Sequence, residues 1–199
     1  MRNQKYHADL GDISLRVPEA RVVAKLLLDR IGKKEFIEKT QHENIFQYSN
    51  TGRARRHGFI IRSRLESVDE DLWKLIAEGD FVTATQGTLI ATLKRSWILY
   101  DFFRLEIVPL IEERVFDLPR YHWKKFLDGC RLRDPEMTEW SPATIKRLGT
   151  TLFSILKEAG YIDNTRKPVL NRIIVTPEIM DYLNKHQERE IQYILTWEK

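Results

Sequence analysis

The clearest periodic pattern of apolar residues lies between Ser141 and Gly160. Apolar side chains recur there every three or four positions, which places them on one side of a helix. The members of this apolar side are Ile145, Leu148, Leu152, Phe153, Ile155, Leu156 and Ala159. Ser141 is a good N-cap, Pro142 suits the first helical position, and Gly160 is typical of a helix C-terminus. The pattern therefore predicts an amphipathic helix over residues 141–159.

The opposite side of this predicted helix carries cations and short hydroxyls. Its members are Lys146, Arg147, Thr150, Thr151, Ser154 and Lys157. After Gly160, Tyr161-Ile162 and the β-branched run 173–175 flank a turn-rich segment, which predicts a small β-hairpin. The cations of this hairpin are Arg166 and Lys167 at the tip and Arg172 at the base. A helix followed by a basic hairpin is the pattern of a winged helix-turn-helix, which binds nucleic acid. The alternative is a core helix with a solvated basic face.

Helical periodicity also covers most of the remaining chain. It predicts helices over residues 18–31, 33–44, 49–65, 69–77, 83–115, 120–132 and 178–198, after an irregular lead-in over residues 1–17. The 83–115 pattern exceeds the usual length, so we expect a junction near residues 101–103 and a kink at Pro109. The predicted fold class is mainly α, with an N-terminal helical bundle over 1–117 and the winged module over 118–199.

A second concentration of basic residues lies in the predicted helix 49–65. Its arginines are Arg53, Arg55, Arg56, Arg62 and Arg64, with no acidic residue between Ser49 and Arg64. Guanidinium groups donate two parallel hydrogen bonds to phosphate oxygens, so this density predicts phosphate contacts. The alternative is that these arginines form salt bridges with the acidic residues that follow, Glu66, Asp69, Glu70 and Asp71.

Composition narrows the class of protein. The chain has 199 residues, 42% of them hydrophobic, which is enough for a packed core and excludes a disordered chain. The net charge of +4 does not by itself indicate a polyanionic partner. The single cysteine excludes a disulfide framework and fits a reducing compartment. The N-terminal residues show no signal-peptide pattern, and charges interrupt the apolar stretch 81–110. We therefore expect a cytoplasmic protein with no membrane-spanning helix.

Catalytic and cofactor motifs do not occur in the sequence. It contains no GxxxxGK[ST] or GxGxxG phosphate-binding loop, no HExxH motif and no paired-cysteine zinc spacing. The five histidines, His7, His42, His57, His122 and His186, are scattered over the predicted helices. We therefore expect no catalytic residues, no cofactor, no metal site and no enzymatic activity.

Several stretches together resemble a known family. They are EARVVAKLLL from Glu19, the arginine-rich helix 53–64 followed by Leu65, Leu72-Trp73, Trp140, and LKEAGYI from Leu156. In this combination the chain resembles the BrxA family of the BREX bacteriophage-defence systems. The resemblance implies a mainly helical protein similar to NusB-like bundles and winged-helix modules. It also implies binding of double-stranded DNA without catalysis in a bacterial cytoplasm.

From the residues and this resemblance, we expect a double-stranded DNA-binding component of a BREX system, with other BREX proteins as candidate partners. The expected DNA contacts are the five arginines of helix 49–65, Lys146, Arg147, Thr150 and Thr151 on helix 141–159, and Arg166, Lys167 and Arg172 of the hairpin. Weak sequence specificity is expected, because the readable face carries no Asn or Gln. Two alternatives stay open: an RNA-binding, antitermination-like factor, and a protein scaffold within the defence complex.

Overall fold

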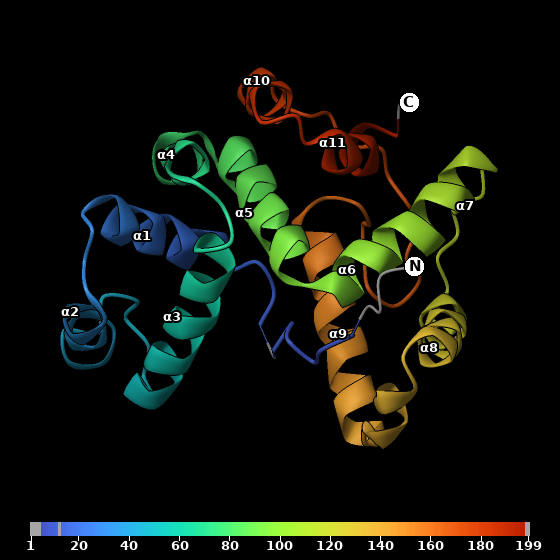
Figure 1. Cartoon of the computed structure of the whole chain (residues 1–199), viewed down its shortest axis with the longest axis horizontal. Helices are drawn as coiled ribbons and strands as arrows, with labels where there is room; N and C mark the ends of the chain where they lie inside the picture. Colours follow the sequence, from blue (N-terminus) through green and yellow to red (C-terminus); the bar gives the residue numbers. More distant parts are fainter. Residues whose placement is uncertain (1–4, 12, 198–199) are drawn as a thin grey trace. The chain divides into compact units, whose positions relative to one another are not determined.

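The computed structural model describes residues 5–11 and 13–197, and these residues are mainly helical, which confirms the predicted α class (Figure 1). The α-helices are α1 (Val17–Leu28), α2 (Lys33–Ile37), α3 (Thr51–Leu65), α4 (Glu70–Glu78), α5 (Phe81–Arg95), α6 (Trp97–Phe102), α7 (Val108–Glu112), α8 (Tyr121–Arg133), α9 (Pro142–Glu158), α10 (Pro177–Lys185) and α11 (Arg189–Thr196). Two π-helical turns, η1 (Glu38–His42) and η2 (Phe103–Ile107), and a 3₁₀ turn, η3 (Pro135–Glu139), complete the helical elements.

Three of the predicted helices are divided in the structure. Residues 33–44 form α2 and the π-turn η1, and the closing helix is divided into α10 and α11. The 83–115 pattern is broken first at Ser96, whose backbone is extended (φ −120°, ψ 104°) and whose Oγ donates to Asp9 Oδ1 at 2.6 Å. The expected junction near 101–103 appears as the wider turn η2, and Pro109 lies in the first turn of α7.

The chain divides into two compact units. Unit 1 contains the described residues up to Ser14, then Ser96–Val175 and the residues from Leu183 onward, and unit 2 contains Leu15–Arg95 and Thr176–Tyr182. This division does not coincide with the domain boundary predicted between 117 and 118. In unit 1 the ring of Phe102 on α6 meets Trp123, Phe126 and Phe153, with ring centroids 5.2–6.5 Å apart. Residues 96–117 therefore share a core with α8 and α9.

Unit 2 is organised around α5, which packs against α1, α3 and α4 (Figure 1). All residues from Thr83 to Leu93 are buried. The buried threonine hydroxyls donate to carbonyls one turn earlier, as in Thr88 to Ala84 at 2.7 Å and Thr92 to Thr88 at 2.8 Å. These bonds satisfy the hydroxyl groups, so the threonines can lie in a buried stretch of α5 without unpaired polar atoms. The start of α10 joins this unit, because the Thr176 amide donates to Gln86 Oε1 at 3.0 Å.

The helix predicted over 141–159 is confirmed as α9. The Ser141 side chain accepts from the Thr144 amide at 3.2 Å, as an N-cap does, and Pro142 is the first helical residue. Gly160 has φ +84°, a left-handed conformation that glycine adopts without steric cost. Local sequence therefore determines both ends of α9.

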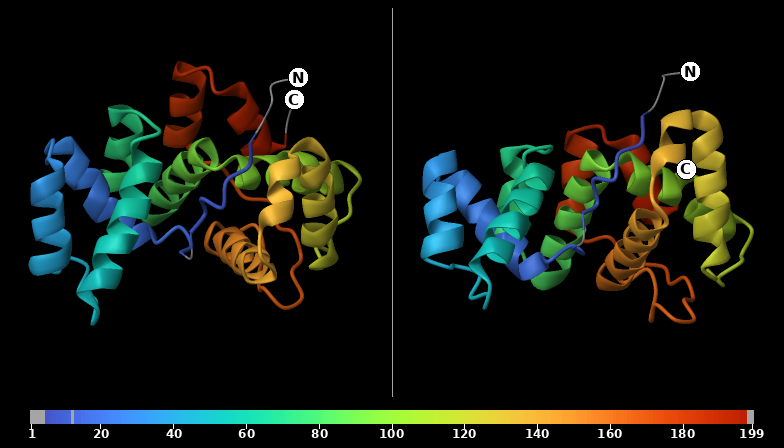
Figure 2. Two further views of the ribbon diagram at one scale, coloured as in Figure 1. Left: turned by 60° about the horizontal axis from the view of Figure 1, so that its bottom comes forward. Right: turned by 90° about the horizontal axis from the view of Figure 1, so that it is seen from below.

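The hairpin after α9 differs from the prediction (Figure 2). Among the described residues, β-structure is limited to two isolated antiparallel bridges, Ile162 with Leu170 and Asp117 with Val169. The predicted strand at 173–175 is wrong, since Ile174 is 88% exposed and outside both bridges. The Asn164 side-chain oxygen accepts from the amides of Arg166 and Lys167 at 3.0 and 2.8 Å. This turn closes early, so the chain pairs again at 168–171 instead of 173–175.

Candidate nucleic-acid interface

The polar face of α9 presents two free cations. Lys146 and Arg147 are exposed, and neither forms an ion pair within the part of the chain that the structure describes. Thr150 is exposed beside them, and its hydroxyl donates to the Lys146 carbonyl at 3.0 Å. The Thr150 oxygen keeps its acceptor capacity, while its proton is used within the helix. This face can therefore approach a polyanion.

Thr151 does not belong to this face, which corrects its assignment as a DNA contact. Its side chain is 5% exposed, and its hydroxyl donates to the Gly11 carbonyl at 3.4 Å within unit 1. One residue along a helix turns the side chain by about 100°, which carries Thr151 from the exposed side at Thr150 to the covered side. The periodicity alone placed it on the polar face.

The turn after α9 supplies the second cationic group of unit 1. Arg166 and Lys167 are exposed, and Arg172 is exposed in the segment that follows the bridges. A hydrogen bond from the Asn164 amide holds the pKa of the exposed Asp163 carboxyl below its usual value, so one negative charge lies at the start of the turn. The two tip cations outnumber this single charge.

Arg120 is a cation of this region that sequence reasoning did not select. Its Nη2 donates to the Thr165 carbonyl at 3.2 Å, and its guanidinium lies 4.6 Å from the ring centroid of Phe153. Arg120 therefore connects the start of α8, the core side of α9 and the turn. The sequence places Arg120 directly before α8, but only the fold brings its guanidinium to the turn after α9.

The five arginines of α3 divide into two groups. Arg53, Arg55 and Arg56 are exposed in the first half of the helix and remain candidates for phosphate contact. Arg62 is half-buried, donates from Nε to Glu66 Oε1 at 2.7 Å and lies 4.9 Å from the ring centroid of Phe36. Arg64 is 2% exposed. Arg64 is therefore corrected as a DNA contact, because its side chain is buried. Arg62 is less accessible than the first three arginines, because it is half-buried and paired with Glu66.

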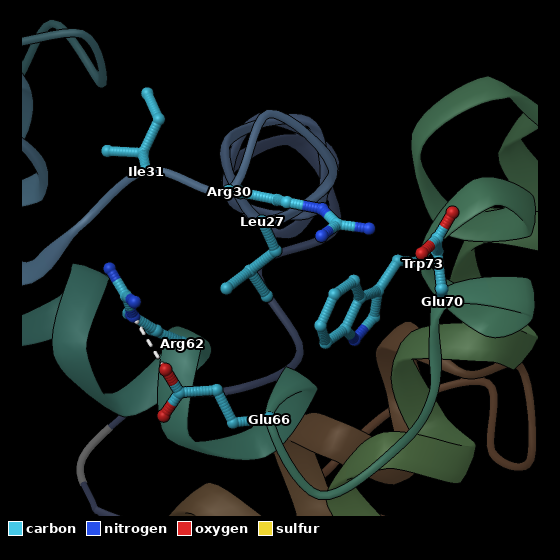
Figure 3. A pocket seen from close by; sticks show the side chains of 7 residues that line it. All are labelled: Leu27, Arg30, Ile31, Arg62, Glu66, Glu70 and Trp73. Carbon is cyan, nitrogen blue, oxygen red and sulfur yellow. Dashed lines mark hydrogen bonds and ion pairs between the residues drawn. The ribbon is translucent and has the colours of Figure 1, made fainter.

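A pocket near the C-terminal half of α3 agrees with this correction (Figure 3). Its volume is 380 Å³, and it is lined by Leu27, Arg30, Ile31, Arg62, Glu66, Glu70 and Trp73. The figure shows the Arg62–Glu66 pair on one side and the Trp73 indole on the other. Trp73 Nε1 donates to the Leu65 carbonyl at 2.7 Å, which fixes the indole. Two carboxylates in the lining offset the charges of its two arginines, so this pocket has no excess positive charge to attract a phosphate group.

The N-terminal end of α3 is different in charge. A smaller cavity of 230 Å³ lies there, lined by Arg16, Tyr48, Ser49, Asn50, Arg53 and His57. No carboxylate is among these lining residues, while two of them are arginines. Two exposed groups of candidate cations thus lie among the described residues: the α9 face with its turn in unit 1, and the first half of α3 with this cavity in unit 2.

The thiol of the single cysteine, Cys130, is poorly suited to act as a nucleophile. Cys130 is buried, and burial raises the pKa of its thiol to about 11, although Arg133 acts in the opposite direction. A protonated buried thiol is a weak nucleophile at neutral pH. His122 is also buried, with Nδ1 3.0 Å from Glu106 Oε2, so its ring connects α8 to η2. These groups have structural partners inside unit 1.

Among the described residues, no helix combines the length and the apolar character that crossing a membrane requires. This agrees with the interruption of the apolar stretch 81–110 by charged residues.

Comparison with known proteins gives consistent matches over nearly the whole chain. A family model described as BrxA matches residues 4–187. A protein of Paramagnetospirillum magneticum described as "BREX protein BrxA" is 34% identical over 98% of this chain and 96% of its own length. The Escherichia coli protein of the same description is 30% identical over 98% of this chain and 92% of its own length.

The same fold is found in a solved structure. It is the crystal structure of an uncharacterized protein from Magnetospirillum magneticum, 32% identical in sequence, with a TM-score of 0.88. The match covers 97% of this chain and 99% of that chain. The helical arrangement described above is therefore shared with an experimentally determined relative.

Proposed function

Since this chain belongs to the BrxA family, we propose that it is a double-stranded DNA-binding, non-catalytic component of a BREX phage-defence system that acts in the cytoplasm beside other BREX proteins. The observation that carries the DNA-binding part is the pair of cationic groups in unit 1. Lys146 and Arg147 on α9, with Arg166 and Lys167 on the turn, are exposed and without ion pairs to described residues. Exposed, unpaired cations are the groups that neutralise backbone phosphates.

We further propose that α8, α9 and the following turn form a winged helix-turn-helix with a minimal wing. The order of elements supports this: Phe116–Leu118, then α8, the 3₁₀ turn η3, α9, and two short segments that return antiparallel. The Leu170 amide donates to the Phe116 carbonyl at 2.7 Å, and the Asn171 amide donates to the Tyr161 carbonyl at 2.8 Å. Three segments thus pair at the base of the turn, where a wing has its strands. The resemblance to NusB-like bundles remains a proposal for the N-terminal part, with the helix packing around α5 as its support.

In this proposal α9 is the helix that enters the major groove, whose width admits one α-helix. Lys146 and Arg147 contact phosphates at its edge, and the turn cations contact the neighbouring backbone. Four phosphate contacts predict a salt dependence of log K on log [salt] of about −3.6, at about −0.9 per contact. Weak sequence specificity follows because phosphate contacts fix register without reading bases.

The test is fluorescence anisotropy of a labelled duplex titrated with the full chain over a series of salt concentrations. A variant with Lys146, Arg147, Arg166 and Lys167 changed to Ala is compared with a control that removes four other exposed cations, Lys25, Lys34, Lys94 and Arg189. Both variants lose the same net charge. The proposal expects a much larger loss of affinity, and a flatter salt slope, in the first variant.

Equal losses in the two variants would remove the α9 surface from the proposal. Undetectable duplex binding by the unmodified protein at low salt would refute DNA binding itself. Competition with a structured RNA of equal length separates the RNA-binding alternative, which predicts that the RNA displaces the duplex. The scaffold alternative predicts no binding of either nucleic acid.

A further inference from the structure

The cavity at the N-terminal end of α3 has the chemistry of an oxyanion site, and we propose that it binds one phosphate group. It is lined by Arg16, Tyr48, Ser49, Asn50, Arg53 and His57, and its volume is 230 Å³. Sites for drug-sized organic ligands start at about 300 Å³. The size therefore suits a phosphate group with its immediate substituent, and each lining residue carries a polar or charged group in its side chain.

Arg16 is the fixed cation of this cavity. Its Nη2 donates to the carboxylate of Glu19 and to the hydroxyl of Tyr48, and its guanidinium lies 5.2 Å from the Tyr48 ring centroid. Arg16 Nε is buried and has no hydrogen-bond partner among the described residues. A guanidinium has five N–H donors in a planar fork, so donors remain after the contacts through Nη2. The side chain is held in place with hydrogen-bonding capacity left over.

The neighbours of Arg16 hold it without placing an anion in the cavity. Burial raises the pKa of the Tyr48 phenol, and its hydrogen bond to Glu19 raises it further, so Tyr48 stays neutral. Its hydroxyl donates to Glu19 Oε1 at 2.8 Å and lies 3.3 Å from His57 Nδ1. Glu19 is 9% exposed and is not part of the lining. The Glu19 carboxylate is therefore hydrogen-bonded to Arg16 and Tyr48 and does not line the cavity.

Arg53 is the second cation, and it is placed by the start of α3. The Asn50 side-chain oxygen accepts from the Arg53 amide at 2.8 Å, which caps the helix, and Ser49 and Asn50 line the same cavity. The Arg53 side chain is exposed and forms no ion pair with a described residue. The positive end of the dipole of a 15-residue helix adds to the two guanidinium groups. Arg16 and Arg53 can thus donate to one phosphate from two elements.

Inorganic phosphate is the first probe. The full chain is titrated with sodium phosphate at constant ionic strength, balanced with chloride, while backbone amide resonances are followed by NMR. The proposal expects a saturable shift confined to residues 48–53, 57 and 16. Shifts that do not saturate, or that spread over all basic surfaces, would overturn it.

A matched pair of variants distinguishes binding in the cavity from non-specific attraction of phosphate to positive charge. Arg53→Ala and Arg55→Ala each remove one exposed arginine from the same helix, but only Arg53 lines the cavity. We expect Arg53→Ala to weaken phosphate binding by at least about tenfold, the value of one charge-assisted hydrogen bond, and Arg55→Ala to change it less than about twofold. Equal effects would refute the site. Arg16→Lys keeps the charge and removes the fork, so it is expected to weaken binding similarly while circular dichroism stays unchanged.

DNA duplexes then show whether the cavity takes a terminal phosphate or a phosphate within the DNA backbone. This step rests on the proposed function. Duplexes with 5′-phosphate and 5′-hydroxyl ends are compared by anisotropy in the same two variants. Preference for the 5′-phosphate duplex, lost in Arg53→Ala, identifies a terminal phosphate. Equal binding of both duplexes, weakened more by Arg53→Ala than by Arg55→Ala, identifies an internal phosphodiester.

The two proposals can fail separately. If duplex DNA binds and the two variants lose affinity equally, the cavity is refuted and DNA binding stands. If inorganic phosphate saturates the cavity and no duplex binds, the DNA-binding proposal is refuted and the phosphate site stands.

Discussion

Gly149 on α9 lies against the Trp123 indole of α8, and its replacement by alanine tests how the basic face of α9 is positioned. A Cβ at this position would lie 2.6 Å from Trp123 Nε1 and 2.8 Å from Trp123 Cδ1. Both atoms belong to a buried indole, whose Nε1 donates to the Ile145 carbonyl at 3.3 Å. Trp123 must therefore move, or the two helices must separate.

The magnitude follows from three opposing terms. Alanine in place of glycine inside a helix stabilises by about 1 kcal/mol through backbone propensity. Overpacking of a filled interior costs about 1–3 kcal/mol, and loss of the indole hydrogen bond costs about 1 kcal/mol more. We therefore expect Gly149→Ala to lower the free energy of unfolding by about 1–3 kcal/mol. For a chain of this size that corresponds to about 2–4 °C in Tm per kcal/mol.

The control is Gly129→Ala on α8. A Cβ there meets only the Arg133 Nη1 atom at 3.4 Å, the end of a flexible side chain. Propensity then dominates, and we expect Gly129→Ala to stabilise by up to about 1 kcal/mol. Urea unfolding followed by tryptophan fluorescence and circular dichroism measures both variants. A Gly149→Ala protein as stable as the unmodified one would refute the close approach. As a second readout, displacement of α9 should weaken duplex binding in Gly149→Ala and leave it unchanged in Gly129→Ala.

Three further outcomes follow from individual contacts. Thr151→Val should leave duplex affinity within about twofold, because the hydroxyl faces Gly11; a larger loss in anisotropy titrations would return Thr151 to the interface. Arg62→Ala should likewise leave duplex affinity within about twofold, because Glu66 pairs with the guanidinium. A loss as large as that of Arg53→Ala would contradict the division of α3. Cys130 should not react with a thiol-specific disulfide reagent at pH 8 in the folded protein, since burial raises its pKa to about 11, and should react once urea unfolds the chain. Rapid reaction without denaturant would show that the thiol is accessible.

The residues of the candidate interface could be predicted where the apolar periodicity of one helix determines which side chains are exposed. Lys146 and Arg147 were selected because they lie opposite an apolar stripe, and the structure leaves them exposed. Thr151 was misassigned because the N-terminal segment covers that side of α9 through Gly11. Arg64 was misassigned because its side chain is buried, which the spacing of arginines along one helix does not reveal. Periodicity identifies the two sides of a helix, but the width of the covered side depends on what packs there.

The turn after α9 shows the same limit. The β-branched run 173–175 favours a strand by composition, yet a strand needs a partner at the correct register. The Asn164 side chain closes the turn by accepting two amides, and the chain has already paired at Leu170 before the run begins. Propensity predicted pairing after α9, and hydrogen bonding in the turn decided which residues pair.

What the sequence determined by itself is the set of features whose causes lie within a few residues. These are the mainly helical class, the two ends of α9 at Ser141 and Gly160, and the positions of the cations along α3 and α9. Caps, helical periodicity and breakers act over one or two turns, so a single sequence reveals them. The family resemblance likewise rests on stretches that can be seen without the fold.

Only the tertiary structure decided which cations remain available and where a cavity forms. Arg62 is paired with Glu66 and lies over the Phe36 ring. Arg53 instead lines a cavity together with Arg16 and Tyr48. Arg16 lies 32 positions before Tyr48 in the chain, and no local pattern connects the two residues. Burial, pairing and cavity lining depend on segments distant in sequence, because they arise when helices pack and not when they form.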